Sequence, residues 1–224
     1  MEKFFEPSLW VLKLGLIEYE QAYHLQSGLR KARKEGRLDD TLLILQHPPT
    51  ITLGRKGGKE NLLVKEEELK RKGIRLYFTD RGGDITYHGP GQLVGYPVLC
   101  LRHHVLSVGN YMRLLEEVII LTLKDLGIES NRMLPLIGLW VGRKKIASLG
   151  VRVRKGVTTH GFALNVNNDL TPFQFIYPCG IRGLQVTSLK EILGGEVDHG
   201  FVEERVVINF GRVFRMRIRE KDYV

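Results

Sequence analysis

The sequence predicts a single α+β domain in which a mixed, largely antiparallel sheet is flanked by helices. Apolar runs of strand length follow one another along the chain, and helical patterns are interspersed among them instead of alternating strictly with strands. No linker, repeat or low-complexity stretch divides the 224 residues, of which 43% are hydrophobic. That is enough apolar material for one sizeable core. We therefore expect one domain that spans residues 1–224.

The first half of the chain predicts two helices and four strands. Apolar residues recur at helical spacing from Ile17 to Lys34, and a short charged helix is expected over residues 65–72. A basic, glycine-rich loop, Arg55-Lys-Gly-Gly-Lys59, precedes that charged helix. Apolar segments of strand length lie at residues 41–46, 50–53, 74–79 and 93–101.

The second half predicts a long helix, a meander of strands and two further helices. Ser107 is placed to cap an amphipathic helix that ends before Gly127. Ser188 and Glu191 have the spacing of a capping box for a short helix, and the pattern over residues 202–216 is helical. Between these helices, strands separated by glycine-containing turns are expected at residues 136–141, 145–153 and 157–166.

The charge and cysteine content narrow the possible partners and location. Lys+Arg minus Asp+Glu is 34 − 25 = +9, which implies an anionic partner such as nucleic acid, a membrane surface or an acidic protein. The two cysteines, Cys100 and Cys179, are too few for a disulfide framework. We find no signal peptide, no lipid-anchor motif and no apolar run of about 20 residues. We expect a soluble, cytoplasmic protein without membrane contact.

Cys179 is the candidate nucleophile. It lies in Tyr177-Pro-Cys-Gly180, where Pro178 fixes the backbone before the cysteine and Gly180 permits close approach of a ligand or backbone. A cysteine thiolate attacks electrophilic carbonyls, and the backbone N–H that follows the cysteine is a candidate oxyanion donor. The alternative is a structural cysteine, because free cysteine is among the most buried residue types.

Lys145 is the candidate activator of that thiol. It opens a strand of small and apolar residues that runs from Ile146 to Val151. A lysine held against such a surface has to be paired or deprotonated, and beside a thiol it serves as a base or as a counter-charge. The alternative is a solvated turn lysine, like its neighbours Arg143 and Lys144.

The segment from Arg81 to Tyr96 combines glycines with hydrogen-bond donors. Its glycines suit a close backbone approach to a ligand, and the intervening polar side chains offer donors to a carbonyl, a phosphate or a carboxylate. No Gly-Lys-Ser/Thr follows, so the segment is not a P-loop. The alternative is a glycine-rich turn between strands.

These segments together resemble the octanoyltransferases of lipoate synthesis, the lipoyl(octanoyl) transferases. Residues 81–96 resemble the family signature, and residues 178–180 are similar to its nucleophile loop. The resemblance runs in order from about residue 40 to 195. It also covers residues 47–55, an early strand-turn-strand; residues 145–152, the lysine segment; and residues 160–166, an acyl-pocket strand.

The resemblance implies the fold of biotin and lipoate ligase catalytic domains and a ping-pong acyl transfer. An octanoyl or lipoyl group on the phosphopantetheine of acyl carrier protein would move to Cys179, and then to the ε-amine of a lysine on a lipoyl domain. This is the first step of endogenous protein lipoylation. The acceptors implied are the E2 subunits of 2-oxoacid dehydrogenases and the glycine cleavage H protein. No bound cofactor or metal is implied, and we expect a monomer.

The resemblance also implies the residues of the site. Lys145 would assist Cys179 as a base or by its charge. The +9 charge would speed the association of acidic carrier proteins and lipoyl domains. Residues 55–59 would form a docking surface or a phosphate contact. The alternative is that this loop is a solvated turn. The substrate-binding residues implied are Arg81, Gly82, Gly83, Asp84, Ile85, Thr86, Tyr87, His88, Ser148, Leu149, Gly150, Gly161, Phe162 and Ala163.

Four other interpretations stay open on the sequence alone. An ATP-dependent lipoate or biotin ligase would share the fold but would not need the Cys179 nucleophile. A nucleic-acid-binding module has only the charge in its favour, and a salt-dependent gel shift would test it. A papain-like hydrolase would pair Cys179 with His160 or His88. A metal site at Cys100, His103 and His104 lacks an evident fourth ligand.

Overall fold

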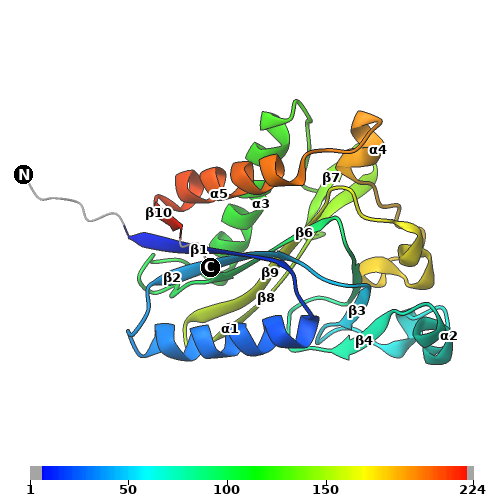
Figure 1. Cartoon of the computed structure of the whole chain (residues 1–224), viewed down its shortest axis with the longest axis horizontal. Helices are drawn as coiled ribbons and strands as arrows, with labels where there is room; N and C mark the ends of the chain where they lie inside the picture. The colour runs from blue at the N-terminus through cyan, green and yellow to red at the C-terminus, as the bar shows by residue number, and fades with distance from the viewer. Residues whose placement is uncertain (1–6, 221–224) are drawn as a thin grey trace, which may run out of the picture.

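The computed structural model describes residues 7–220, which form two sheets and the helices around them (Figure 1). The fold is α+β, so the predicted fold class is confirmed. The expected domain span of 1–224 stays a prediction, because residues 1–6 and 221–224 lie outside the described residues. No helix among residues 7–220 is long and apolar enough to cross a membrane.

The larger sheet has seven strands in the order β10-β1-β2-β6-β9-β8-β7. The first three strands are parallel to one another, and each remaining neighbour pair is antiparallel, as the largely antiparallel prediction requires. The strands are β1 (Ser8–Leu16), β2 (Asp40–Gln46), β6 (Gln92–Val98), β7 (Leu139–Val141), β8 (Lys144–Arg154), β9 (Val157–Asn165) and β10 (Arg217–Glu220).

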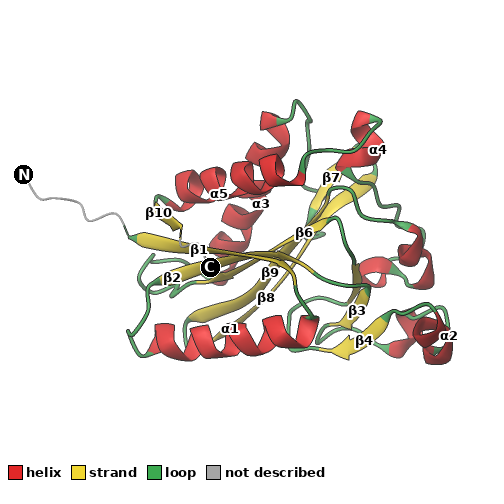
Figure 2. Ribbon diagram, in the orientation of Figure 1, coloured by secondary structure: helices red, strands yellow, loops and turns green. Residues whose placement is uncertain are grey.

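Helices cover both faces of this sheet (Figure 2). On one face α3 (Val108–Asp125) and α5 (His199–Phe214) enclose the main core, in which Leu115 and Phe210 are fully buried. On the other face α1 (Tyr19–Lys34) packs through Ala22 against β2, β6 and β9. Burial of apolar side chains on both faces stabilises the central strands.

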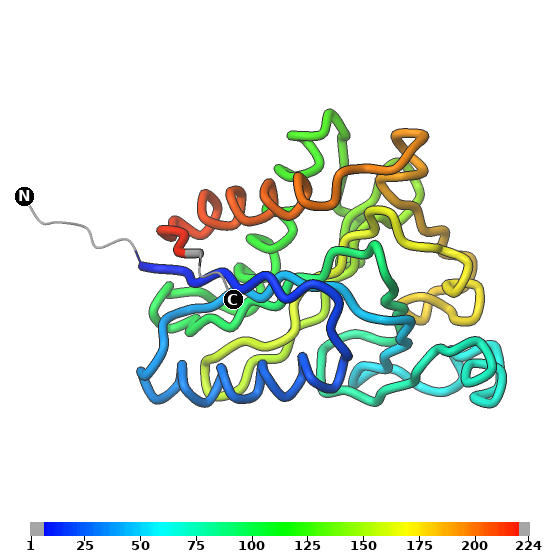
Figure 3. The backbone as a smooth tube through the Cα atoms, viewed as in Figure 1, coloured from blue at the N-terminus to red at the C-terminus, as the bar shows by residue number. Residues whose placement is uncertain are grey.

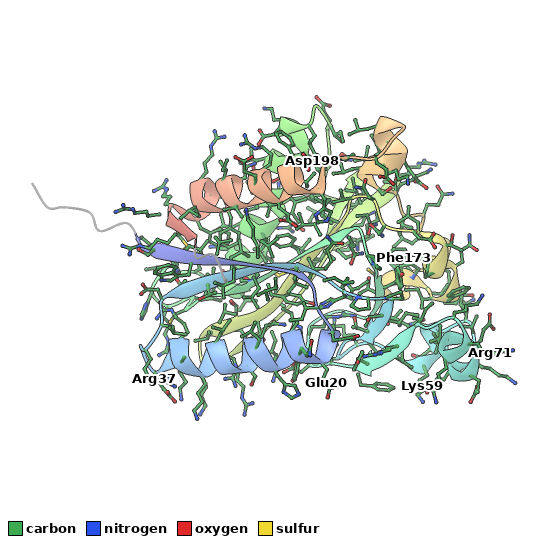
Figure 4. The ribbon with its side chains drawn as sticks, in the orientation of Figure 1. Glu20, Arg37, Lys59, Arg71, Phe173 and Asp198 are labelled. Carbon is green, nitrogen blue, oxygen red and sulfur yellow. The ribbon has the colours of Figure 1, made fainter. Side chains whose placement is uncertain are left out.

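The smaller sheet has three strands in the order β4-β3-β5 and lies beside one end of the larger sheet (Figure 3). Its core contains Ile51, Ile85 and Phe173, and Figure 4 shows Phe173 on the same side of the molecule as Lys59 and Arg71. Its strands are β3 (Thr50–Leu53), β4 (Arg75–Phe78) and β5 (Ile85–His88), and α2 (Glu66–Arg71) precedes β4 in the chain. The short helix α4 (Leu189–Leu193) contributes Leu189 to the main core instead.

The helix ends follow the predicted capping chemistry closely. The Ser107 hydroxyl accepts a hydrogen bond from the Asn110 N–H at 3.1 Å, and Gly127 has a φ of +74° directly after the last residues of α3. Ser188 accepts from the Glu191 N–H at 3.2 Å. The Glu191 carboxylate accepts from the Thr187 hydroxyl instead of a backbone N–H, so the capping box is formed in one direction.

Three strands were not predicted. β1 and β10, which lie near opposite ends of the sequence, pair with each other in parallel. The third, β5, lies inside the glycine-rich segment. The strand predicted over 93–101 is shorter in the structure, where β6 ends at Val98. Beyond it, the Leu101 N–H donates to the carbonyl of Gly156, which lies in the turn between β8 and β9.

Candidate active site

Lys145 and Cys179 are in direct contact. The Lys145 Nζ lies 3.1 Å from the Cys179 Sγ and also donates to the Ile137 carbonyl oxygen at 2.9 Å. Lys145 is only 3% exposed, whereas Cys179 is half-buried. The two residues are 34 positions apart in sequence, so the fold brings together the candidate nucleophile and its candidate activator. An ammonium at this distance stabilises a thiolate.

Neighbouring backbone holds Lys145 at the start of β8. Its N–H donates to the Gln185 carbonyl at 2.8 Å, and its own carbonyl accepts from the Thr187 N–H at 2.9 Å. On the β7 side, the Nζ lies 4.9 Å from the centre of the Trp140 ring. Gly138 makes room for the side chain, since a Cβ there would lie 2.5 Å from the Lys145 Cε. The lysine is therefore fixed on all sides and is not a solvated turn residue.

Cys179 occupies a strained backbone position. Its φ is +59°, in the left-handed region that non-glycine residues rarely adopt, and Gly180 follows with a φ of +72°. The Gly180 N–H donates to the Tyr177 carbonyl at 2.8 Å. That donor closes the turn in this conformation, so the oxyanion role of the N–H after the cysteine stays a prediction.

A cavity of about 460 Å³ opens beside the pair, and both Lys145 and Cys179 line it. Two strands of the large sheet and the glycine-rich segment form its walls. The candidate substrate-binding residues that line it are Arg81, Gly82, Gly83, Asp84, Ile85, Thr86, His88, Ser148, Leu149, Gly150, Gly161, Phe162 and Ala163. The fold therefore gathers residues that lie up to 82 positions apart around a single cavity.

Glycines let these walls approach one another. The Gly82 N–H donates to the Val151 carbonyl at 2.9 Å, and a Cβ on Gly150 would lie 2.7 Å from the Gly82 carbonyl oxygen. A Cβ on Gly161 would lie 2.1 Å from the Gly95 carbonyl oxygen. The glycines of these sequence motifs thus allow the backbone of the glycine-rich segment to pack closely against the large sheet.

Arg81 is buried in this wall, with its guanidinium bonded to the small sheet. Its Nη2 donates to the Thr52 carbonyl at 2.6 Å and to the Thr52 hydroxyl at 2.8 Å, and its Nη1 donates to the Gly82 carbonyl at 3.1 Å. Burial lowers the pKa of Arg81. Most of the guanidinium N–H groups therefore donate to other residues of the protein. Arg81 both lines the cavity and joins the glycine-rich segment to the small sheet.

Neutral aromatic and imidazole rings line another part of the cavity. Burial lowers the pKa of His88 to about 3, and its Nδ1 lies 2.7 Å from the Gln92 Oε1. Burial likewise raises the pKa of Tyr96, whose hydroxyl lies 2.8 Å from the Nε2 of His47. These groups are uncharged at neutral pH, so this part of the cavity wall is polar without being charged.

Tyr87 is the one candidate substrate residue that does not line this cavity. Its ring packs edge-on against Phe173 in the core of the small sheet, with the ring centres 5.5 Å apart. Thr86 and His88 lie on one face of β5 and line the cavity, whereas Tyr87 lies on the opposite face, in the small core. Ile85 is on the face of Tyr87 and also reaches the cavity, at the start of the strand. A substrate contact by Tyr87 has no support in this geometry.

Sequence reasoning missed several residues that line the cavity. Most come from the loop before β7 and from the start of α3, neither of which carries a chemical motif. An apolar run in a loop that follows a helix is the signal that would have pointed to them. The missed residues are Tyr19, Val108, Met112, Pro135, Leu136, Ile137, Val151 and Ile181.

The cysteine–histidine interpretation does not fit the contacts. Among the described residues, the hydrogen-bond partner of the Cys179 Sγ is Lys145. His160 Nε2 lies 2.9 Å from the Asp80 Oδ1, and His88 is bonded to Gln92. Both histidines are therefore engaged away from the thiol.

The proposed cluster at Cys100, His103 and His104 belongs to a buried ion network instead. His104 and Arg33 both contact the carboxylate of Asp40, and the Cys100 N–H donates to the same carboxylate at 2.9 Å. His103 contacts Arg33. No group of three or more potential metal ligands is found in residues 7–220.

The basic loop 55–59 is tied to the glycine-rich segment by its backbone. The Arg55 N–H donates to the Arg81 carbonyl at 3.0 Å, and the Lys56 N–H donates to the Gly83 carbonyl at 3.0 Å. Lys56 lines the cavity, whereas Lys59 forms an exposed ion pair with Glu66 at 2.7 Å. Of this loop's basic side chains, Lys56 is the one at the cavity.

Comparison with solved structures supports the fold assignment. The chain superposes on lipoate-protein ligase A bound with ATP with a TM-score of 0.75 at 19% identity, covering 98% of this chain and 90% of that one. It superposes on the Aquifex aeolicus biotin protein ligase in complex with biotin and ATP with a TM-score of 0.55 at 16% identity, covering 93% and 70%. At these identities the likeness concerns the fold alone.

Sequence relatives identify the family more specifically. Residues 18–211 match the family model of the lipoyl protein ligase A/B catalytic domain. The octanoyltransferase of Solibacter usitatus (strain Ellin6076) is 51% identical over 202 residues, covering 90% of this chain and 91% of the relative. That of Caldicellulosiruptor saccharolyticus is 47% identical over 211 residues, covering 93% and 90%. The chain belongs to the octanoyltransferase family and is an acyltransferase of protein lipoylation.

Proposed function

We propose that Cys179 carries the octanoyl group as a thioester between a carrier-protein donor and a lysine acceptor. The observation that carries this proposal is the 3.1 Å contact between the Lys145 Nζ and the Cys179 Sγ beside a cavity of about 460 Å³. A paired thiolate is the nucleophile that thioester exchange requires.

In the first half-reaction the Cys179 thiolate attacks the carbonyl carbon of octanoyl-phosphopantetheine on acyl carrier protein. The new carbon–sulfur bond to Cys179 forms, the bond to the phosphopantetheine sulfur breaks, and the Lys145 ammonium gives its proton to the departing thiolate. The direct contact of Lys145 with the Cys179 Sγ supports this proton transfer. An octanoyl-enzyme and a neutral Lys145 result.

In the second half-reaction the neutral ε-amine of a lipoyl-domain lysine attacks the thioester. The carbon–nitrogen bond forms, the bond to Cys179 breaks, and Lys145 accepts the proton that the amine loses. The enzyme returns to a thiolate paired with an ammonium. The acceptors we propose are the lipoyl domains of 2-oxoacid dehydrogenase E2 subunits and the glycine cleavage H protein. A lipoate protein ligase of Thermoplasma acidophilum, similar in fold, has been solved in a study with its E2 lipoyl domain.

The charge and the cavity fit the carrier-borne donor. The +9 charge favours association with acidic carrier and lipoyl domains. Lys56, at the cavity, supplies a cation for the phosphodiester of the phosphopantetheine arm. Apolar walls formed by Leu149 and Phe162 hold the acyl chain, to which each buried methylene contributes about 0.8 kcal/mol.

A transfer assay without ATP tests this function against the ligase interpretation. With octanoyl-acyl carrier protein as donor and a purified lipoyl domain as acceptor, we expect the octanoyl amide to form on the acceptor in the absence of nucleotide. Octanoic acid with ATP and Mg²⁺ serves as the alternative substrate mixture. Product only from the free acid and ATP would contradict the proposal and favour a ligase.

A further inference from the structure

A half-buried carboxylate, that of Asp84, lies against the loop that carries Cys179. Asp84 directly precedes β5, and its Oδ1 accepts from the Ile85 N–H at 2.6 Å. Its Oδ2 accepts from the Asn61 Nδ2 at 2.9 Å. The Asn61 carbonyl in turn accepts from the Tyr177 N–H at 2.8 Å. A continuous chain of hydrogen bonds thus runs from the glycine-rich segment to the residue two positions before the nucleophile.

Gly180 packs directly on this pair. A Cβ at Gly180 would lie 2.6 Å from the Asp84 Oδ2 and 3.2 Å from the Asn61 Nδ2. The residue after the nucleophile therefore lies against the side-chain hydrogen bond between Asp84 and Asn61, and the residue two positions before the nucleophile is bonded to the Asn61 backbone carbonyl. Asp84 and Asn61 hold the loop on both sides of Cys179.

The loop needs an external support because its backbone is strained. Cys179 and Gly180 are consecutive left-handed residues, with φ values of +59° and +72°. A left-handed conformation is unfavourable for a cysteine and persists only where the surroundings impose it. The turn's own hydrogen bonds, such as Gly180 N–H to the Tyr177 carbonyl, hold it locally but do not fix it relative to Lys145.

We propose that Asp84 and Asn61 are positioning residues, which hold Cys179 in the left-handed conformation that faces its thiol to Lys145. Asp84 acts through the loop instead of through contact with the acyl group. The inference rests on the proposed function only in taking Cys179 as the nucleophile.

Exchanging the two side chains tests this role. Asn61→Asp places a second carboxylate 2.9 Å from Asp84 and replaces the hydrogen bond with repulsion. The double variant Asn61→Asp/Asp84→Asn restores an amide–carboxylate bond with the partners exchanged, and the amide oxygen that it introduces at position 84 still accepts from the Ile85 N–H. Asn61 does not line the acyl cavity, so the single variant leaves the cavity wall unchanged.

The readouts separate positioning from folding. We expect Asn61→Asp to lower kcat for a small thioester, octanoyl-pantetheine, by about tenfold or more with KM nearly unchanged, since a displacement of about 1 Å costs up to 100-fold. Iodoacetamide alkylation of Cys179 at neutral pH should slow in parallel. The double variant should recover most of the alkylation rate, which does not depend on the cavity wall that Asp84 lines, while the thermal midpoints confirm that all variants are folded.

Two results would overturn the inference. One is a wild-type kcat and alkylation rate in Asn61→Asp, and the other is a double variant whose Cys179 is alkylated as slowly as that of the single variant. The alkylation rate needs no acyl donor. If Cys179 formed no octanoyl thioester, the proposed function would fail, while alkylation would still decide whether Asp84 and Asn61 position the thiol.

Discussion

Replacing Lys145 by methionine removes one charge from the site and changes little else in shape. In the structure the Nζ donates to the Cys179 Sγ at 3.1 Å and to the Ile137 carbonyl at 2.9 Å, and the residue is 3% exposed. Methionine fills most of the same buried volume without a polar head. The variant therefore isolates the effect of the ammonium on the thiol.

The magnitude follows from the contact. A hydrogen bond to a charged group contributes about 1.5–3 kcal/mol, and about 1.4 kcal/mol corresponds to a tenfold change in an equilibrium. Loss of this contact should therefore slow the alkylation of Cys179 at pH 7 by about 10- to 100-fold. Octanoyl transfer from the carrier protein should fall by at least as much, because in the proposed mechanism the same group protonates the leaving thiolate.

Alkylation by iodoacetamide, followed by peptide mass spectrometry, measures this directly. Cys100 is 8% exposed and provides an internal control in every sample. Equal rates at pH 7 would refute the reasoning, since the ammonium would then not stabilise the thiolate.

Two further predictions concern stability and specificity. Burial lowers the pKa of His47 to about 4 and that of His88 to about 3. Below about pH 6.5 the unfolded chain binds protons that the folded chain does not, so the unfolding free energy should fall by about 2–3 kcal/mol between pH 7.5 and 5.5. Urea unfolding measures this, and His47→Gln should remove about half of the dependence; a flat profile in the wild type would contradict it. Ala163→Leu adds three carbons at the cavity wall and should shift the ratio of kcat/KM for octanoyl over hexanoyl thioesters toward hexanoyl by about tenfold, at about 0.8 kcal/mol for each displaced methylene. An unchanged ratio would show that the acyl chain lies elsewhere.

Local patterns in the sequence were enough to predict most elements and several of their ends. The helix predicted from Ile17 to Lys34 corresponds to α1 at Tyr19–Lys34, and the capping roles of Ser107 and Gly127 are confirmed. These features depend on residues within a few positions of one another, which a single sequence displays.

Features that depend on distant pairing were not predictable in this way. β1 takes one neighbour, β10, from the other end of the chain, and nothing local to Ser8–Leu16 specifies a parallel partner. The Asp84–Asn61 hydrogen bond likewise joins a motif residue to a loop with no chemical signature. Tyr87 was grouped with its motif neighbours, although strand alternation turns it into the small core.

The candidate site was predictable because its residues carry chemistry as well as packing. A cysteine between proline and glycine, and a lysine at the start of an apolar strand, were candidates from the residues alone. The resemblance to the octanoyltransferases joined them as the pair that the fold brings to 3.1 Å. The apolar wall from Pro135 to Ile137 was missed because such residues fill cores and loops alike. Roles of single residues in substrate binding stay predictions.

The most direct test of the account is the intact mass of the protein after incubation with octanoyl-acyl carrier protein. We predict one added octanoyl group in the wild type, located on Cys179 by peptide mapping and lost when a lipoyl domain is added. Cys179→Ala should remain folded and unmodified, and should transfer nothing. Transfer to the lipoyl domain by Cys179→Ala at the wild-type rate, with no adduct on the enzyme, would contradict the thioester mechanism.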